Sequence, residues 1–190
     1  KSGERGLLGI TEALAIEPDN YVALNNRGPE RQARGDADGA IADYDLAVRL
    51  NPAHVEAYTN RGAARQAKGN LDGALADFNQ ALRLNPREAN AYTNRGTVRQ
   101  AQGDLASALA DYDAALRVNP QHTKAYTNRG TLRQAQGDLA GALADFASAL
   151  RLDPDYASAY NNRGNARQAQ GDLDGALADF SSAIRLNPKD

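Results

Sequence analysis

Proline recurs along this chain at a fixed interval, and that interval constrains the fold more than any other feature. Six of the seven prolines follow one another every 34 residues, namely Pro18, Pro52, Pro86, Pro120, Pro154 and Pro188. A constant period of this length is typical of solenoids, in which one supersecondary unit is repeated and stacked. We therefore expect 1–190 to form a single solenoid, with a half unit at 1–20 followed by full units at 21–54, 55–88, 89–122, 123–156 and 157–190.

Each unit has the pattern of a helical hairpin. In unit 89–122, Gly103 ends a first helix, Asp104 is suited to cap the next one, and Asn119-Pro120 stops it. Apolar residues of the second segment recur at spacings of three and four, as on one face of a helix. The pattern predicts first helices near 22–34, 56–68, 90–102, 124–136 and 158–170. It predicts second helices near 37–50, 71–84, 105–118, 139–152 and 173–186, and a shorter helix over 4–16.

The repeated residues resemble the tetratricopeptide repeat. Each of the last four units has an early tyrosine and a glycine four residues later (Tyr58, Gly62; Tyr92, Gly96; Tyr126, Gly130; Tyr160, Gly164), and small residues flank an aromatic, as Ala74 and Ala81 flank Phe78. The resemblance implies an all-α, right-handed superhelical solenoid of antiparallel hairpins, with first helices lining a concave face. It also implies a non-catalytic scaffold with peptide or protein ligands.

Arginine occupies two positions per unit where the family usually has large apolar residues. These are Arg27 and Arg31, Arg61 and Arg65, Arg95 and Arg99, Arg129 and Arg133, and Arg163 and Arg167. An aspartate lies as far after each hairpin turn as the first arginine lies before it, so antiparallel helices place the two at one level. This predicts an arginine–aspartate ladder inside the stack, with pairs Arg61–Asp77, Arg95–Asp111, Arg129–Asp145 and Arg163–Asp179. The alternative is an arginine row that binds anions.

Neutral polar side chains line the surface that the resemblance assigns to the concave face. The candidate binding residues are Asn25, Thr59, Asn60, Gln66, Thr93, Asn94, Gln100, Thr127, Asn128, Gln134, Asn161 and Gln168. Lys124 is the one lysine in the region where chaperone-binding relatives have a lysine-rich carboxylate clamp, so we do not expect chaperone tails as ligands. The columns are interpreted either as a solvated groove or as an amide ladder that bonds to an extended backbone or a glycan.

The composition argues against other functions. Lys plus Arg is 22 and Asp plus Glu is 24, so no basic excess favours nucleic acid or an anionic membrane. Cysteine is absent, and the two histidines, His54 and His122, lie two units apart. We find no glycine-rich phosphate loop or metal-spaced carboxylate cluster, and expect no cofactor and no enzyme activity. Pro29 falls within a first helix, which predicts a kinked or degenerate first unit.

Two functions fit this sequence. The first is a protein–protein interaction scaffold that binds a peptide or protein partner on its concave face. The alternative is a structural subunit that stacks head-to-tail into a filament, because a second helix lies at each end and no polar cap is apparent. The candidate end contacts are Leu7, Ile10, Leu14, Leu177, Phe180 and Ile184.

Overall fold

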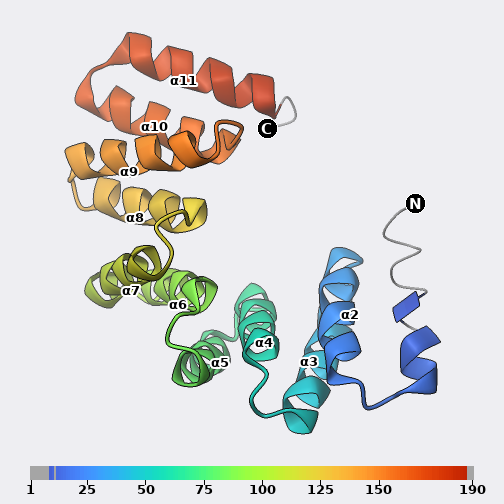
Figure 1. Cartoon of the computed structure of the whole chain (residues 1–190). Helices are drawn as coiled ribbons and strands as arrows, with labels where there is room; N and C mark the ends of the chain where they lie inside the picture. The colour runs from blue at the N-terminus through green and yellow to red at the C-terminus, as the bar shows by residue number, and fades with distance from the viewer. Residues whose placement is uncertain (1–8, 11, 188–190) are drawn as a thin grey trace. The chain divides into compact units, whose positions relative to one another are not determined.

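The computed structural model describes residues 9–10 and 12–187, and all regular structure in these ranges is helical (Figure 1). The first helices are α2 (Tyr21–Ala33), α4 (Val55–Ala67), α6 (Ala89–Ala101), α8 (Thr123–Ala135) and α10 (Ala157–Gln170). The second helices are α3 (Ala37–Leu50), α5 (Leu71–Leu84), α7 (Leu105–Val118), α9 (Leu139–Leu152) and α11 (Leu173–Leu186). Residues 9–10 and 12–16 are also helical, and the rest of the helix predicted over 4–16 lies outside the described residues.

The repeat pattern predicted these helices closely. Every second helix has the predicted bounds, and each first helix begins one residue earlier than predicted. The reason for the shift is the link after each proline, where the residue before the helix adopts a non-helical conformation. His54 before α4, for example, has φ −78° and ψ 90°, and the helix starts directly after it.

The turn inside each hairpin combines a glycine with a capping side chain. Gly137 has a φ of +83°, in the left-handed region that glycine adopts at little cost. The next residue, Asp138, accepts a hydrogen bond from the backbone N–H of Gly141 at 2.9 Å and so caps α9. The backbone hydrogen-bonding groups at the end of one helix and the start of the next thus find partners within a short turn. The chain therefore reverses sharply, and the two helices of a hairpin pack side by side.

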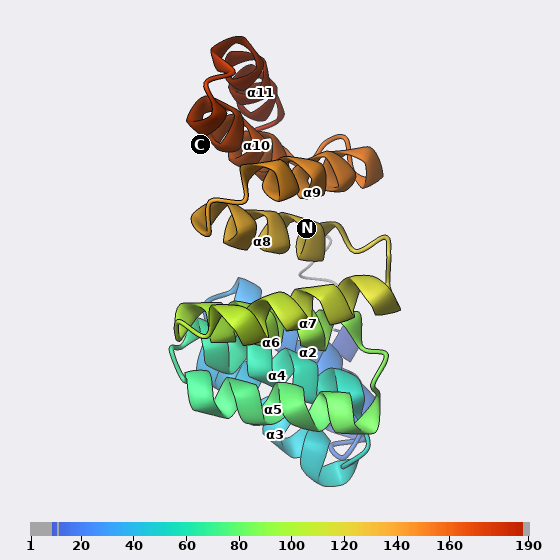
Figure 2. The same ribbon diagram turned by 90° about the vertical axis from the view of Figure 1, so that its left-hand side faces the viewer.

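The chain forms two compact bodies, an N-terminal body (residues 1–98) and a C-terminal body (residues 99–190). Within each body, helices adjacent in sequence pack against one another, as α4 and α5, and α10 and α11, do in Figures 1 and 2. A second helix contacts its own first helix and the first helix of the following unit, as α9 contacts α8 and α10. The division of 1–190 into one solenoid stays a prediction.

Aromatic side chains of the second helices fill the space between units. Phe146 is fully buried with Ala142 of α9 and Ala166 of α10. Gly130 on α8 makes this position possible, because a Cβ atom there would lie 2.7 Å from Cε1 of Phe146. The glycine of the first helix thus makes room for the aromatic ring of the second helix, and burial of that ring stabilises the hairpin.

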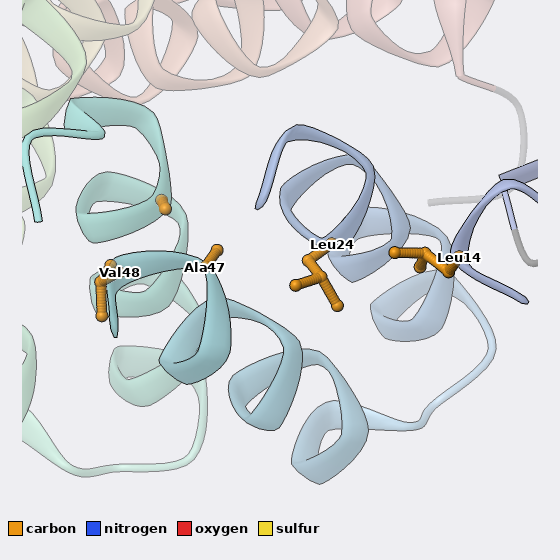
Figure 3. Packing of buried hydrophobic residues seen from close by; sticks show 5 residues of the cluster. Leu14, Leu24, Ala47 and Val48 are labelled. Carbon is orange, nitrogen blue, oxygen red and sulfur yellow. The ribbon is translucent and has the colours of Figure 1, made fainter. Parts of the chain in front are cut away.

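The N-terminal helical segment packs into the first unit. Leu14 is 7% exposed and belongs to a buried cluster with Leu24, Ala47, Val48 and Ala57 (Figure 3). Leu14 is therefore part of the core of its own body, and its role as an end contact stays a prediction. Pro29 is exposed, and α2 continues through it to Ala33, so the helix is not broken there.

Candidate functional site

The arginine positions form bidentate ion pairs within the hairpins. Arg129 donates from Nε to Oδ2 of Asp145 at 2.9 Å and from Nη2 to Oδ1 at 2.6 Å. Arg133, one turn later on α8, donates from Nη1 to Oδ2 of Asp145 at 2.8 Å. Asp145 is 3% exposed, so a buried carboxylate holds two guanidinium groups at the centre of the hairpin. This geometry supplies the hydrogen bonds that a buried charge requires.

The same arrangement recurs in the other hairpins. Bidentate pairs join Arg27 to Asp43, Arg61 to Asp77 and Arg163 to Asp179, with Nη2–Oδ1 distances between 2.5 and 2.7 Å. The second arginine of the unit lies within 3.2 Å of the same aspartate at Arg31, Arg65, Arg99 and Arg167. Arg95 and Asp111 belong to different bodies, so that pair stays a prediction.

The first arginine also reaches back to the preceding unit, which sequence reasoning missed. Nη1 donates from Arg61 to Asp45 at 2.7 Å, from Arg95 to Asn79 at 2.7 Å and from Arg129 to Asp113 at 2.6 Å. The sequence spacing could have indicated this contact, since the acceptor lies 16 residues before the arginine and the ladder aspartate lies 16 residues after it. One guanidinium therefore connects two successive second helices.

The electrostatics of these arginines favour a structural role. Burial of the Arg129 guanidinium opposes its charge, but hydrogen bonds to Asp145 and Asp113 outweigh this and hold its pKa above the ordinary value. Its Cζ atom also lies 5.7 Å from the ring centroid of Tyr126, where a cation–π contact is favourable. Where both acceptors are present, the guanidinium is engaged on three sides and offers little to a free anion.

The threonines predicted to face a ligand are buried. Thr59, Thr93 and Thr127 are at most 8% exposed, and each hydroxyl donates to the backbone carbonyl four residues earlier. Asn25, in the same column, is 4% exposed and accepts from Nδ2 of Asn60 at 3.0 Å. Stacking of units covers most of this column, so these four side chains make packing contacts, and their part in ligand binding stays a prediction. Asn161, in the last unit, is exposed.

The next column along the first helices remains accessible. Asn60, Asn94 and Asn128 are half-buried, and the full column includes two asparagines that sequence reasoning omitted, Asn26 and Asn162. The sequence could have shown that Asn26 and Asn162 belong to this column, because every unit has asparagine directly before its first arginine of the ladder. Nδ2 of Asn162 lies 3.4 Å from Oγ1 of Thr131 in the preceding unit.

The glutamines of the first helices differ in whether a tyrosine hydroxyl of the same hairpin bonds to them. Gln100 accepts from the hydroxyl of Tyr112 at 2.8 Å. Hairpins with phenylalanine in place of tyrosine provide no such hydroxyl, and their glutamines are Gln66, Gln134 and Gln168. Gln66 and Gln134 are half-buried and Gln168 is exposed, so these three are the better ligand candidates.

A polar pocket lies along the first helices of the N-terminal body. It has a volume of about 250 Å³ and is lined by Glu56, Thr59, Asn60, Glu88 and Asn90. The amide of Asn60 thus borders a cavity as well as its neighbouring unit. A pocket of this kind suits hydrogen bonding to a polar ligand.

The last second helix exposes an apolar face. Leu177 is 67% exposed, Ile184 is 61% exposed, and Phe180 is half-buried. Phe180 and Ile184 border a pocket of about 580 Å³ between α10 and α11. At the other end, Ile10 is half-buried against the Leu14 cluster, and Leu7 lies outside the described residues.

Other kinds of site find no support in the part of the chain that the structure describes. Residues 9–10 and 12–187 contain no group of three or more His, Asp or Glu side chains placed to hold a metal ion. None of the helices described there is long and apolar enough to cross a membrane. His122 is half-buried, its Nε2 atom has no partner among these residues, and burial together with the charge of Lys124 lowers its pKa.

Two family models match most of this chain. A family model described as "TPR repeat" matches residues 31–69, 65–103 and 132–171, and one described as "Tetratricopeptide repeat" matches residues 89–122 and 157–190. A search of curated proteins finds no match.

Solved structures of several such proteins have a similar fold. YrrB, described as a TPR protein with an unusual peptide-binding site, is 25% identical with a TM-score of 0.64, and the match covers 95% of this chain and 93% of YrrB. TTC0263, a thermophilic TPR protein of Thermus thermophilus, is 24% identical with a TM-score of 0.77, covering 90% and 93%. A chain of an APC/C hetero-tetramer is 18% identical with a TM-score of 0.90, covering all of this chain and 38% of that one. The chain belongs to the tetratricopeptide repeat family, whose generally non-catalytic fold typically mediates protein–protein interactions.

Proposed function

We propose that this protein is a scaffold that holds an extended segment of a partner protein along the first helices of its N-terminal body. The asparagines of the column in that body (Asn26, Asn60 and Asn94) supply the contacts to the partner's backbone. One observation carries the proposal: Asn60, a half-buried member of this repeated column, borders the polar pocket of the N-terminal body.

The bonding capacity of Asn60 supports this role. Its Nδ2 donates to the buried Asn25, which fixes the orientation of the amide. An asparagine amide has two N–H donors and two acceptor lone pairs, so Asn60 retains one N–H and its carbonyl oxygen for a ligand. An extended peptide presents N–H and C=O groups and can pair with such an amide through both. Because the neighbouring unit holds the side chain in place, less rotamer entropy is lost on binding.

A second column can select the partner's side chains. The second residue of each first helix differs between units: Val22, Glu56, Asn90, Lys124 and Ser158. All five side chains are exposed. A uniform amide column beside a variable column separates backbone binding from sequence preference. The peptide-binding site named for YrrB is consistent with a peptide ligand here.

The proposal is tested with a phage-displayed library of random peptides, about 12 residues long, selected on the purified chain. We expect the double variant Asn60→Ala/Asn94→Ala to bind selected peptides about 5- to 150-fold more weakly by fluorescence anisotropy, since one neutral hydrogen bond of about 0.5–1.5 kcal/mol is lost at each of the two positions. The matched control is Gln80→Ala/Ser107→Ala on the second helices. Selected peptides that lose binding only in the control variant would place the ligand on the other surface and overturn the proposal.

Head-to-tail stacking into a filament is the second candidate function. It is supported at one end by the exposed apolar side chains of α11, Leu177 and Ile184. At the other end it loses Leu14, which is buried within its own body. We therefore favour the peptide-holding scaffold.

A further inference from the structure

The arginines that connect successive units do not all meet the same acceptor. Arg61 and Arg129 each donate from Nη1 to a carboxylate of the preceding second helix, Asp45 and Asp113, at 2.7 and 2.6 Å. Both aspartates are surface side chains, 42% and 44% exposed. We call the contact between a second helix and the first helix of the next unit a joint. In these two joints, a carboxylate on the surface accepts a hydrogen bond from the first arginine of the following unit.

The joint between α9 and α10 has the same arginine without the carboxylate. At the position equivalent to Asp45 and Asp113, α9 carries Ala147, whose exposed methyl group replaces the acidic side chain. Nε and Nη2 of Arg163 donate to Asp179 at 2.9 and 2.7 Å, as the other ladder arginines do to their own aspartates. The described residues place no acceptor at Nη1, so one donor of a fixed, charged guanidinium faces the surface beside Ala147.

The surroundings of Arg163 hold it in the orientation that the other joints use. Its Cζ atom lies 5.5 Å from the ring centroid of Tyr160, and its side chain is 19% exposed. Arg167 donates to the same Asp179, so two guanidinium groups share one carboxylate there. In the α3–α4 joint the second carboxylate, Asp45, bonds to both Arg61 and Arg65. The charge that Asp45 supplies in that joint is missing beside Arg163.

We propose that the surface at Ala147 and Arg163 is a carboxylate-binding position that takes an aspartate or glutamate side chain of a partner protein. The partner's carboxylate occupies the place that Asp45 and Asp113 occupy in their joints and accepts from Nη1 of Arg163. Since Nε and Nη2 are engaged with Asp179, binding requires no rearrangement of the arginine. The position lies between Ala147 of the second helix α9 and Arg163 of the first helix α10, and it uses none of the asparagine amides of the proposed function.

The test follows the Nε–Hε NMR signals of the ladder arginines during titration with sodium acetate and, separately, with the blocked peptide acetyl-Gly-Glu-Gly-amide. Sodium chloride at the same ionic strength is the reference. We expect a saturable shift of the Arg163 signal with both carboxylates and not with chloride. The signals of Arg61 and Arg129 should stay within the chloride response, because their acceptors are present.

Two substitutions on the second helices should exchange the acetate responses of Arg163 and Arg129. Ala147→Asp should supply the carboxylate internally, abolish the acetate shift at Arg163 and raise the midpoint of thermal unfolding. Asp113→Ala should create the same opening at Arg129 and make that signal respond to acetate. Ala140→Asp is the control, since it adds the same charge to α9 two turns away and should change neither response. The proposal is overturned if Arg163 responds to acetate and chloride equally, if the response survives in Ala147→Asp, or if acetate binds and the peptide does not.

Discussion

Replacing Asp145 with alanine tests the role of the arginine–aspartate ladder most directly. The carboxylate is 3% exposed and accepts three hydrogen bonds, from Nε and Nη2 of Arg129 and from Nη1 of Arg133. In the alanine variant these donors lose their partner while both guanidinium groups stay in the hairpin. The variant should therefore lower the free energy of unfolding by more than the removal of a contact alone.

The magnitude follows from burial. Breaking a buried ion pair costs about 3–5 kcal/mol, because it leaves an uncompensated charge. The side chains of Arg129 and Arg133 are 16% and 27% exposed, and Arg129 keeps its bond to Asp113, so water and a second carboxylate recover part of the loss. We expect a cost of about 3 kcal/mol, at the lower end of that range. The matched variant Asp113→Ala removes one bond from a residue that is 44% exposed and should cost less than about 1 kcal/mol.

The assay combines urea unfolding, followed by circular dichroism, with hydrogen exchange. In a repeat array each unit contacts only its neighbours, so loss of protection should concentrate in α8 and α9 and leave α4 and α5 largely unchanged. Replacing Arg129, Arg133 and Asp145 together with leucine should recover most of the stability, since apolar residues can substitute for a buried charge cluster. The reasoning fails if Asp145→Ala costs no more than Asp113→Ala.

Three further changes test the packing, the histidine and the ends. Gly130→Ala should cost on the order of 1–3 kcal/mol by urea unfolding, because its Cβ would lie 2.7 Å from Phe146; an unchanged midpoint would contradict the close packing. Because the pKa of His122 is lowered in the folded state, the unfolded state binds more protons, and stability should fall as the pH drops below about 6.5. In thermal melts at several pH values, His122→Asn should reduce this decline, and an unchanged decline would contradict the lowered pKa of His122. Light scattering over a concentration series should show growth that Leu177→Asp prevents if the chain stacks end to end, and a constant monomer mass excludes stacking.

Sequence periodicity predicted the helices because their signals are local. A proline, a glycine and a capping aspartate at fixed places end and start helices whatever the neighbouring units do. The bounds of α9 were therefore predicted to the residue, and the approach of Arg129 to Asp145 followed from counting along two antiparallel helices. Both inferences needed only the residues of one hairpin.

The accessible surface could not be predicted in the same way, because it depends on how units stack. Thr127 and Asn128 are adjacent polar residues on one helix, yet the first is 4% exposed and the second is half-buried. The sequence by itself determined the repeat, the helices and the arginine–aspartate pairs of the hairpins that lie within one body. Only the tertiary structure decided which polar column is covered, which leucine is buried and which carboxylate of a neighbouring unit reaches an arginine. The physical reason is that these outcomes depend on packing between segments about 34 residues apart, where small differences in side-chain direction determine what is in contact.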